Sequence, residues 1–310
     1  MGVKMSKARF DGRIVSLEEY RKSMKGQLRC IYCGTPITHV SGHTKSVGDR
    51  EVWVKSYFRL LNKENPHNEG CEYITSNFVK KIFAKVSDTD LMTKKGDKYI
   101  ARLHIVMEEV VEKDKWNGIK GGGKGRTDKK PTKKYIRNGE KPAYLQTMKK
   151  IVNLKERLDN DKELKDLVVL QIYNDFKKAY DEIKWKNFYV DYNVKQYEYI
   201  YKLLKNNKVY HPICFAGEIK EVKKIQDKDL YVIKYYSIKK AEGEYISLSI
   251  MTKSRDVYEY AEGLIDKKIV AYGCGHYIGN VNNTKKDGKD IKYYNFSTYV
   301  NVKEQLFVLE

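Results

Sequence analysis

The feature of the sequence that most constrains its fold is a set of cysteine and histidine residues with the spacing of metal ligands. Cys30 and Cys33 are separated by two residues and followed by Gly34, and His67 and Cys71 form a second pair further along the chain. Two cysteines on such a tight turn can place both thiolates on one metal ion, and glycine permits the turn. Because four protein ligands close a tetrahedral shell, we expect Cys30, Cys33, His67 and Cys71 to bind one structural Zn²⁺.

Other interpretations of these residues are open at this stage. His39 and His43 compete with His67 for the position of the nitrogen ligand. The cysteines could instead be buried without a metal, or could form a redox pair, which would require the motif between a strand and a helix. Pro36 and the polar residues after it do not predict a helix there. The five cysteines of the chain show no even-numbered disulfide pattern, which is typical of a reducing, cytoplasmic compartment.

The order Cys30-x-x-Cys33, then Tyr-Phe-Arg-Leu at residues 57–60, then His67-x-x-x-Cys71 resembles the N-terminal zinc-binding segment of the competence-protein CoiA family. The resemblance covers only the segment from Cys30 to Cys71. The positions that flank the phenylalanine are histidines in the family and are tyrosine and arginine here. The resemblance implies a zinc site in a DNA-associated protein, with a nuclease-like domain to follow. Because we find no convincing set of nuclease carboxylates and lysine downstream, the catalytic residues of such an activity stay unknown.

The charge of the chain favours a polyanionic partner. Its 61 lysines and arginines exceed its 41 acidic residues, which gives a net charge of +20. Such a charge attracts nucleic acid and accelerates encounter with it, although it says nothing about the fold. No segment approaches the ~18–20 consecutive apolar residues of a membrane span, so we expect a soluble protein without a membrane partner.

Composition divides the chain into four regions. Residues 1–112 are expected to form a zinc-binding α+β domain. Residues 113–142 hold eleven Lys or Arg, three Asp or Glu and three consecutive glycines, a pattern typical of a basic linker or loop. Within this linker we expect non-specific phosphate contacts from Lys129, Lys130, Lys133 and Lys134. A phosphate-binding loop is not favoured, because Gly125 stands where that motif has Ser or Thr.

Residues 143–206 are predicted to be helical. The spacing of apolar residues predicts helices over 144–158 and 194–204, with an extended segment over 185–192 between helices. Over 161–183 the apolar residues recur at intervals of three and four and predict a long amphipathic helix; they are Leu164, Leu167, Val168, Ile172, Phe176, Ala179, Tyr180 and Ile183.

Residues 207–310 are predicted to form a five-stranded β-barrel. Runs of β-branched and aromatic residues predict strands over 213–222, 230–238, 245–251, 268–277 and 291–302, with one short helix over 256–265. Three strands, a helix and two strands is the order of the OB-fold, to which this region is similar in topology alone. Gly217 and Gly273 lie inside these strands, where glycine often marks a bend or a bulge.

A barrel of this kind binds single strands by stacking bases on aromatic side chains within a basic groove. Two groups of candidate contacts follow. The aromatic candidates are Tyr231, Tyr235, Tyr236, Tyr293, Tyr294 and Phe296, of which alternation places Tyr231 and Tyr235 on one face and Tyr236 on the other. The basic candidates are Lys234, Lys239, Lys240, Lys285, Lys286 and Lys292.

A second metal site is an alternative role for His211, Cys214, Cys274 and His276, although buried cysteine is the ordinary interpretation. Taken together, the sequence predicts an α+β protein with a zinc-containing N-terminal domain, a helical middle segment and a C-terminal OB-like barrel. We expect it to bind DNA or RNA, with single strands favoured, while the sequence leaves open whether it has catalytic activity. The alternatives are a metal-dependent nuclease of the CoiA type and a module that binds another protein.

Overall fold

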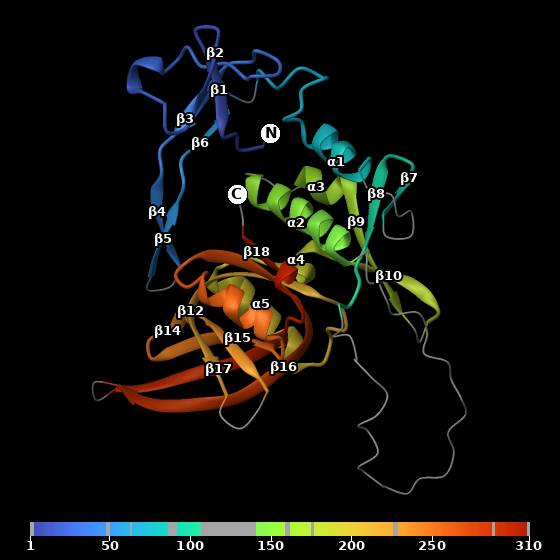
Figure 1. Ribbon diagram of the computed structural model, residues 1–310, viewed down its shortest axis with the longest axis vertical. Coiled ribbons are helices and arrows are strands. Elements are labelled where there is room, and N and C mark those ends of the chain that lie inside the picture. Colours follow the sequence, from blue (N-terminus) through green and yellow to red (C-terminus); the bar gives the residue numbers. More distant parts are fainter. Residues whose placement is uncertain are drawn as a thin grey trace, which may run out of the picture.

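The computed structural model describes residues 3–47, 50–62, 64–85, 92–106, 141–158, 162–174, 177–225, 229–286 and 289–308. It shows an N-terminal region of short β-ribbons, a middle region in which helices pack on a sheet, and a C-terminal region built on a larger sheet (Figure 1). The mixture of helix and sheet expected from the sequence is confirmed.

The N-terminal region is made of two-stranded antiparallel ribbons around a small core. The ribbons are β1 (Lys7–Phe10) with β2 (Arg13–Ser16), β3 (Ile37–Val40) with β6 (Tyr57–Leu60), and β4 (His43–Val47) with β5 (Arg50–Val54). A single 3-10 turn, Lys22–Met24, follows β2. The core includes Leu28, Ile37 and Phe58 together with Cys30 and Cys71. Two of the expected metal ligands are therefore part of the core of this region.

The middle region has a four-stranded sheet with the order β10-β9-β8-β7. Its strands are β7 (Met92–Lys95), β8 (Lys98–Arg102), β9 (Val168–Asn174) and β10 (Ala179–Ile183), and its helices are α1 (Thr75–Phe83), α2 (Lys141–Arg157) and α3 (Lys162–Leu167). Strands β8 and β9 are parallel and the outer pairs are antiparallel. Val168, Leu170 and Ile172 alternate with more exposed residues, so one face of the sheet is buried.

The C-terminal region contains a closed ring of strand pairings. Its eight-stranded sheet comprises β11 (Tyr189–Val190), β12 (Ile213–Lys224), β13 (Tyr231–Tyr235), β14 (Ile238–Ala241), β15 (Glu244–Thr252), β16 (Lys268–Lys286), β17 (Lys289–Tyr299) and β18 (Leu306–Val308). Strand β12 pairs with β13, β13 with β15, β15 with β17, β17 with β16, and β16 returns to β12. We call these five strands the ring. The β15–β17 pairing is parallel and the other four pairings are antiparallel.

Three helices accompany the ring: α4 (Trp185–Phe188), α5 (Val194–Lys205) and α6 (Arg255–Glu262). Helix α6 lies in sequence between β15 and β16. Asn193 and Ser254 cap α5 and α6 by accepting hydrogen bonds from the backbone N–H groups of Gln196 and Val257. A 3-10 turn, Lys303–Gln305, precedes β18.

One hydrophobic core joins the ring to the middle region. Buried residues from α2, β9, α5 and all five ring strands belong to a single cluster of contacts. Within it, the hydroxyls of Tyr144 on α2 and Tyr272 on β16 lie 2.9 Å apart, and Tyr272 donates to the carbonyl of His104. The same cluster thus packs α2, which was assigned to a separate segment from composition, directly against the ring.

The expected elements agree with the structure in most places and fail in two. Strands or helices are found at 144–158, at 194–204 and at each ring segment predicted above. The long helix expected over 161–183 is wrong, because only α3 is helical and the chain then forms the antiparallel hairpin β9–β10. The extended segment expected over 185–192 begins with the helical turn α4. No helix in the described part of the chain is both long enough and apolar enough to cross a membrane.

Candidate metal centre and candidate binding groove

A tight turn brings the first two sulfur ligands together. The N–H of Gly34 donates to the carbonyl of Cys30 at 3.0 Å, and the N–H of Cys30 donates to the carbonyl of Thr35 at 2.8 Å. Gly34 has a φ of +73°, in the left-handed region that favours glycine. The glycine after the second cysteine therefore allows Cys30 and Cys33 to lie on the same side of the turn.

The second ligand pair lies in the loop between β6 and α1. The N–H of Cys71 donates to the carbonyl of Asn68 at 2.8 Å, which curls the chain between His67 and Cys71. The side-chain amide of Asn77, in α1, donates to the carbonyl of Cys71 at 2.9 Å. Local hydrogen bonds and the first turns of α1 thus position this pair.

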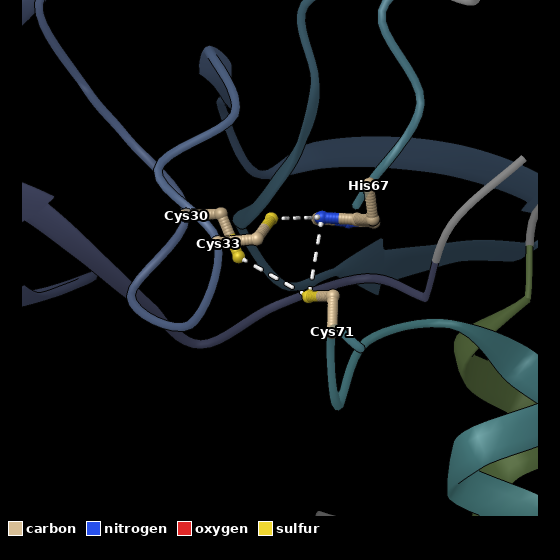
Figure 2. A group of neighbouring side chains, drawn as sticks. All are labelled: Cys30, Cys33, His67 and Cys71. Atoms are coloured by element: carbon tan, nitrogen blue, oxygen red, sulfur yellow. Dashed lines mark hydrogen bonds between the residues drawn. The ribbon is translucent and has the colours of Figure 1, made fainter. Parts of the chain in front are cut away.

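The four candidate ligands converge on one point (Figure 2). Their ligand atoms lie within 4.8 Å of one another. The sulfurs of Cys30 and Cys71 are 3.6 Å apart, and Nδ1 of His67 is 3.3 Å from Cys33 Sγ and 3.5 Å from Cys71 Sγ. Zinc bond lengths in a tetrahedral site would separate two sulfurs by about 3.8 Å and sulfur from nitrogen by about 3.6 Å. The observed separations fit a metal ion of this size, so the four residues could hold one.

The local electrostatics favour one thiolate in the group. Burial acts to raise the pKa of Cys33, but hydrogen bonds with Thr35, with His67 and with backbone N–H groups outweigh it and lower the pKa to about 5. Burial raises the pKa of Cys71. Burial also acts to lower the pKa of His67, yet the neighbouring sulfurs of Cys30 and Cys33 raise it overall. A bound metal cation would displace the protons that these four side chains share, because a cysteine sulfur binds a metal in its deprotonated form.

The rival nitrogen ligands lie elsewhere. The ring of His39 stacks on Tyr20 at 3.9 Å, and Nδ1 of His43 lies 3.3 Å from the carbonyl of Ser41. The alternative second site is also not assembled. Nδ1 of His211 lies 2.9 Å from the carbonyl oxygen of Pro212, and Nε2 of His276 lies 3.1 Å from the carbonyl oxygen of His211. Burial lowers the pKa of His276 to about 4.

Within the described residues, the group of Cys30, Cys33, His67 and Cys71 is the one cluster of three or more His, Cys, Asp or Glu residues that could hold a metal. No carboxylate cluster of nuclease character is found in that part of the chain. No protein-family model matches the sequence, and no curated protein or solved structure matches it either.

A groove of about 590 Å³ is lined by residues from all five ring strands. On β15 the lining residues Ser247, Ser249 and Met251 alternate with the core residues Leu248 and Ile250, while Tyr235 and Phe296, each 1% exposed, also border the groove. Its polar uncharged lining consists of Ser237, Ser247, Ser249, Asn280, Asn282, Thr284, Asn295 and Ser297. Lys220, Glu221 and Lys234 add charge. We call this the ring groove.

Tyrosine pairs lie at both ends of the β17 segment that lines the ring groove. Tyr293 lines the groove and stacks on Tyr245, with ring centroids 5.5 Å apart and planes at 27°. Tyr299 packs edge to face on Tyr277 at 5.7 Å. Tyr277 is 59% exposed and pairs in register with Ser297 of the groove. The groove therefore presents hydrogen-bonding side chains between two sets of aromatic rings.

The structure changes the roles of several aromatic candidates. Tyr235 and Phe296 border the ring groove but are only 1% exposed. The ring of Tyr235 packs in the core, and its hydroxyl donates to the carbonyl of Phe215. Tyr294 lies on the other side of β17 from Tyr293, edge to face with Tyr201 of α5 at 5.8 Å. The ring of Tyr231 packs on Tyr258 of α6 at 4.6 Å.

The basic candidates are spread around the ring. Lys234 lines the groove and forms an ion pair with Glu221 at 3.1 Å. Lys239 and Lys240 pair with Glu242 and Glu244, at 3.1 Å and 2.7 Å. Lys285 and Lys292 are exposed on the β16–β17 hairpin. Lys129, Lys130, Lys133, Lys134 and the side chain of Lys286 lie outside the described residues.

Tyr245, Tyr277 and the groove serines were not singled out from the sequence. A signal for some of them was present, because residues 245–251 alternate Tyr, Ser, Ser and Met with Ile246, Leu248 and Ile250. That alternation separates an outer face from a core face. From that outer face, Ser247, Ser249 and Met251 line the groove.

Proposed function

We propose that the chain binds single-stranded nucleic acid in the ring groove and holds a structural Zn²⁺ at Cys30, Cys33, His67 and Cys71. The observation that carries the first part is the groove itself, a hydrogen-bonding floor between the Tyr245–Tyr293 and Tyr277–Tyr299 pairs. Unpaired bases can stack on tyrosine rings and hydrogen-bond to serine and asparagine, whereas a duplex keeps its bases stacked on one another.

The arrangement of the ring supports an OB-type barrel. Its five strands follow the order strand, strand, strand, helix α6, strand, strand, and β12, the first of them, pairs with β16, the fourth. In OB-folds the face of the second and third strands, together with the hairpin of the last two, binds oligonucleotides. The ring groove is lined by β13 and β15, which hold those positions, and by the β16–β17 hairpin.

The charge of the chain supports a phosphate-bearing ligand. Lys220 and Lys234 line the groove, and Lys285 and Lys292 lie on the adjoining hairpin. With a net charge of +20, the chain attracts a polyanion from solution, while the tyrosines and polar residues select unpaired bases. The lysines at 129, 130, 133 and 134 would add contacts to phosphates without sequence preference.

The zinc part of the proposal rests on the ligand set. Three sulfurs and one imidazole nitrogen at tetrahedral separations suit Zn²⁺, and four protein ligands leave no open coordination position for catalysis. When bound, the ion would join the Cys30–Thr35 turn before β3 to the loop before α1. Its role would be to stabilise the N-terminal core, of which Cys30 and Cys71 are members.

The test is a pair of substitutions at neighbouring residues of β17 that face opposite ways. Tyr293→Ala should weaken binding of a single-stranded oligonucleotide of about 8 nucleotides by roughly 5- to 160-fold, because one stacked base is worth about 1–3 kcal/mol. Tyr293→Phe, which keeps the ring, should bind close to the parent. Tyr294→Ala, on the α5 side, should lower stability and leave the affinity of the folded protein unchanged. Fluorescence anisotropy measures the three affinities, and urea unfolding measures the stability of Tyr294→Ala. Parental affinity in Tyr293→Ala would contradict the proposal.

A further inference from the structure

The four-stranded sheet of the middle region has a second, aromatic and basic face. On β9, Val168, Leu170 and Ile172 are buried, so the residues between and after them, Val169, Gln171 and Tyr173, lie on the opposite face. Register places Tyr180 beside Tyr173 and Arg102 beside Gln171 on that same face. We call this the open sheet face.

The helices of the middle region pack on the other side of the sheet. Leu164 of α3, Ala101 of β8 and Leu170 of β9 belong to the same buried cluster, and Phe83 of α1 contacts the ring of Tyr99 at 4.7 Å. Ala101 pairs with Leu170, so both point to the helical side. In Figure 1, α1, α2 and α3 lie together along one side of this sheet. Among the described residues, the open sheet face keeps Tyr173 and Tyr180 43% and 44% exposed.

The side chains on the open sheet face form a connected aromatic and cationic surface. The rings of Tyr173 and Tyr180 meet edge to face at 5.3 Å. The guanidinium carbon of Arg102 lies over the ring of Tyr180, 4.6 Å from its centroid. These contacts hold two exposed rings and a half-buried arginine in place, so the surface is ordered before a ligand arrives.

The charges of the open sheet face indicate an anionic occupant. Strand alternation on β8 places Lys98 on the same face as Arg102, and Lys95 is the register partner of Lys98. Like charges directly opposite one another on neighbouring strands are destabilising. Asp97 lies in the turn between the two lysines, and Glu182 is the acidic residue of this face. An anion would relieve the repulsion between Lys95 and Lys98.

We propose that the open sheet face is a second surface for single-stranded nucleic acid, separate from the ring groove. Bases stack on Tyr173 and Tyr180, while Arg102, Lys95 and Lys98 meet phosphates. A sheet that presents aromatic rings is a common platform for unpaired bases. This inference rests on the proposed function, and it adds that a long strand contacts both surfaces whereas a short one is held by the ring groove alone.

The experiment compares two oligonucleotides on the full-length protein. One, of about 8 nucleotides, fits a single OB-type groove, and the other, of about 30 nucleotides, exceeds the range of site sizes for one such groove. The double substitution Tyr173→Ala/Tyr180→Ala should bind the short strand like the parent and the long strand at least about 10-fold more weakly. The double substitution to Phe keeps both rings and should restore binding of the long strand. Tyr260→Ala, which removes a tyrosine of α6 that is 38% exposed, is the matched control and should change neither affinity.

The outcomes separate this inference from the proposed function. If the double alanine variant binds the long strand as tightly as the parent while Tyr293→Ala weakens both strands, the open sheet face is not a binding surface and the ring groove stands. If Tyr293→Ala weakens neither strand, the proposed function itself fails. Unfolding by urea, with a midpoint equal to that of the parent, checks that the double variant is folded.

Discussion

At the scale of single residues, neighbouring side chains in this protein have opposite roles. Tyr293 lines the ring groove, whereas Tyr294 packs against α5. The sequence identifies such tyrosines as members of strands but does not say which face of a strand lies inward, because a period of two fits either choice. For Tyr235 the alternation left the outward direction open, and in the structure its side chain is buried. The cluster of four candidate metal ligands was predictable, since their positions follow from spacing along the chain and a glycine at the turn.

The metal centre carries a prediction at this scale. Cys30→Ser removes one of four ligands, so the purified protein should lose most of its zinc, which we expect at about one ion per chain in the parent. Because metal binding is coupled to folding, the N-terminal region should unfold at a lower temperature. Metal analysis and thermal unfolding measure both. His43→Asn changes an exposed histidine outside the group and should keep the metal. Parent protein without zinc, when purified free of chelators, would contradict the site.

At the scale of elements, periodicity succeeded where strands are long and failed where helix and strand patterns coincide. Leu164, Val168 and Ile172 recur every four residues, which fits one face of a helix as well as alternate positions of a strand. The structure resolves this by ending α3 at Leu167 and beginning β9 at Val168, in a run of β-branched and aromatic residues. The ring strands were predictable because their alternation extends over more residues. The pairing of β16 with β12, which closes the ring, could not be predicted from the local sequence pattern.

A glycine within β12 gives a prediction for the ring. A Cβ added to Gly217 would overlap the ring of Tyr235, so the strand approaches that buried tyrosine as closely as it does only because the residue is glycine. Gly217→Ala should lower the free energy of unfolding by about 1–3 kcal/mol through overpacking. Gly70→Ala, at a position with open space around the added carbon, should change it little. Urea unfolding distinguishes the two. Equal stability of both variants would mean that the ring is less tightly packed at Gly217 than described.

At the scale of the whole molecule, two cores and two proposed binding surfaces share one basic chain. The N-terminal core includes two metal-ligand candidates, and the larger core runs from the middle region through the ring. Composition alone divided the middle region from the ring at residue 206. The packing of Tyr144 against Tyr272 is a contact between residues distant in sequence, and no local pattern predicts it. The net positive charge, by contrast, follows directly from the sequence, and it supports a nucleic-acid ligand at both surfaces.

The central claim is that the full-length protein binds unpaired nucleic acid. The most direct measurement is its affinity for a single strand and for a duplex of the same sequence and length, each at two salt concentrations. We predict tighter binding of the single strand at both, with log K falling by about 0.7 per phosphate contact for each unit of log salt concentration. Equal or tighter binding of the duplex would contradict the stacking of unpaired bases in the ring groove. Binding that does not change with salt would contradict a phosphate-bearing ligand.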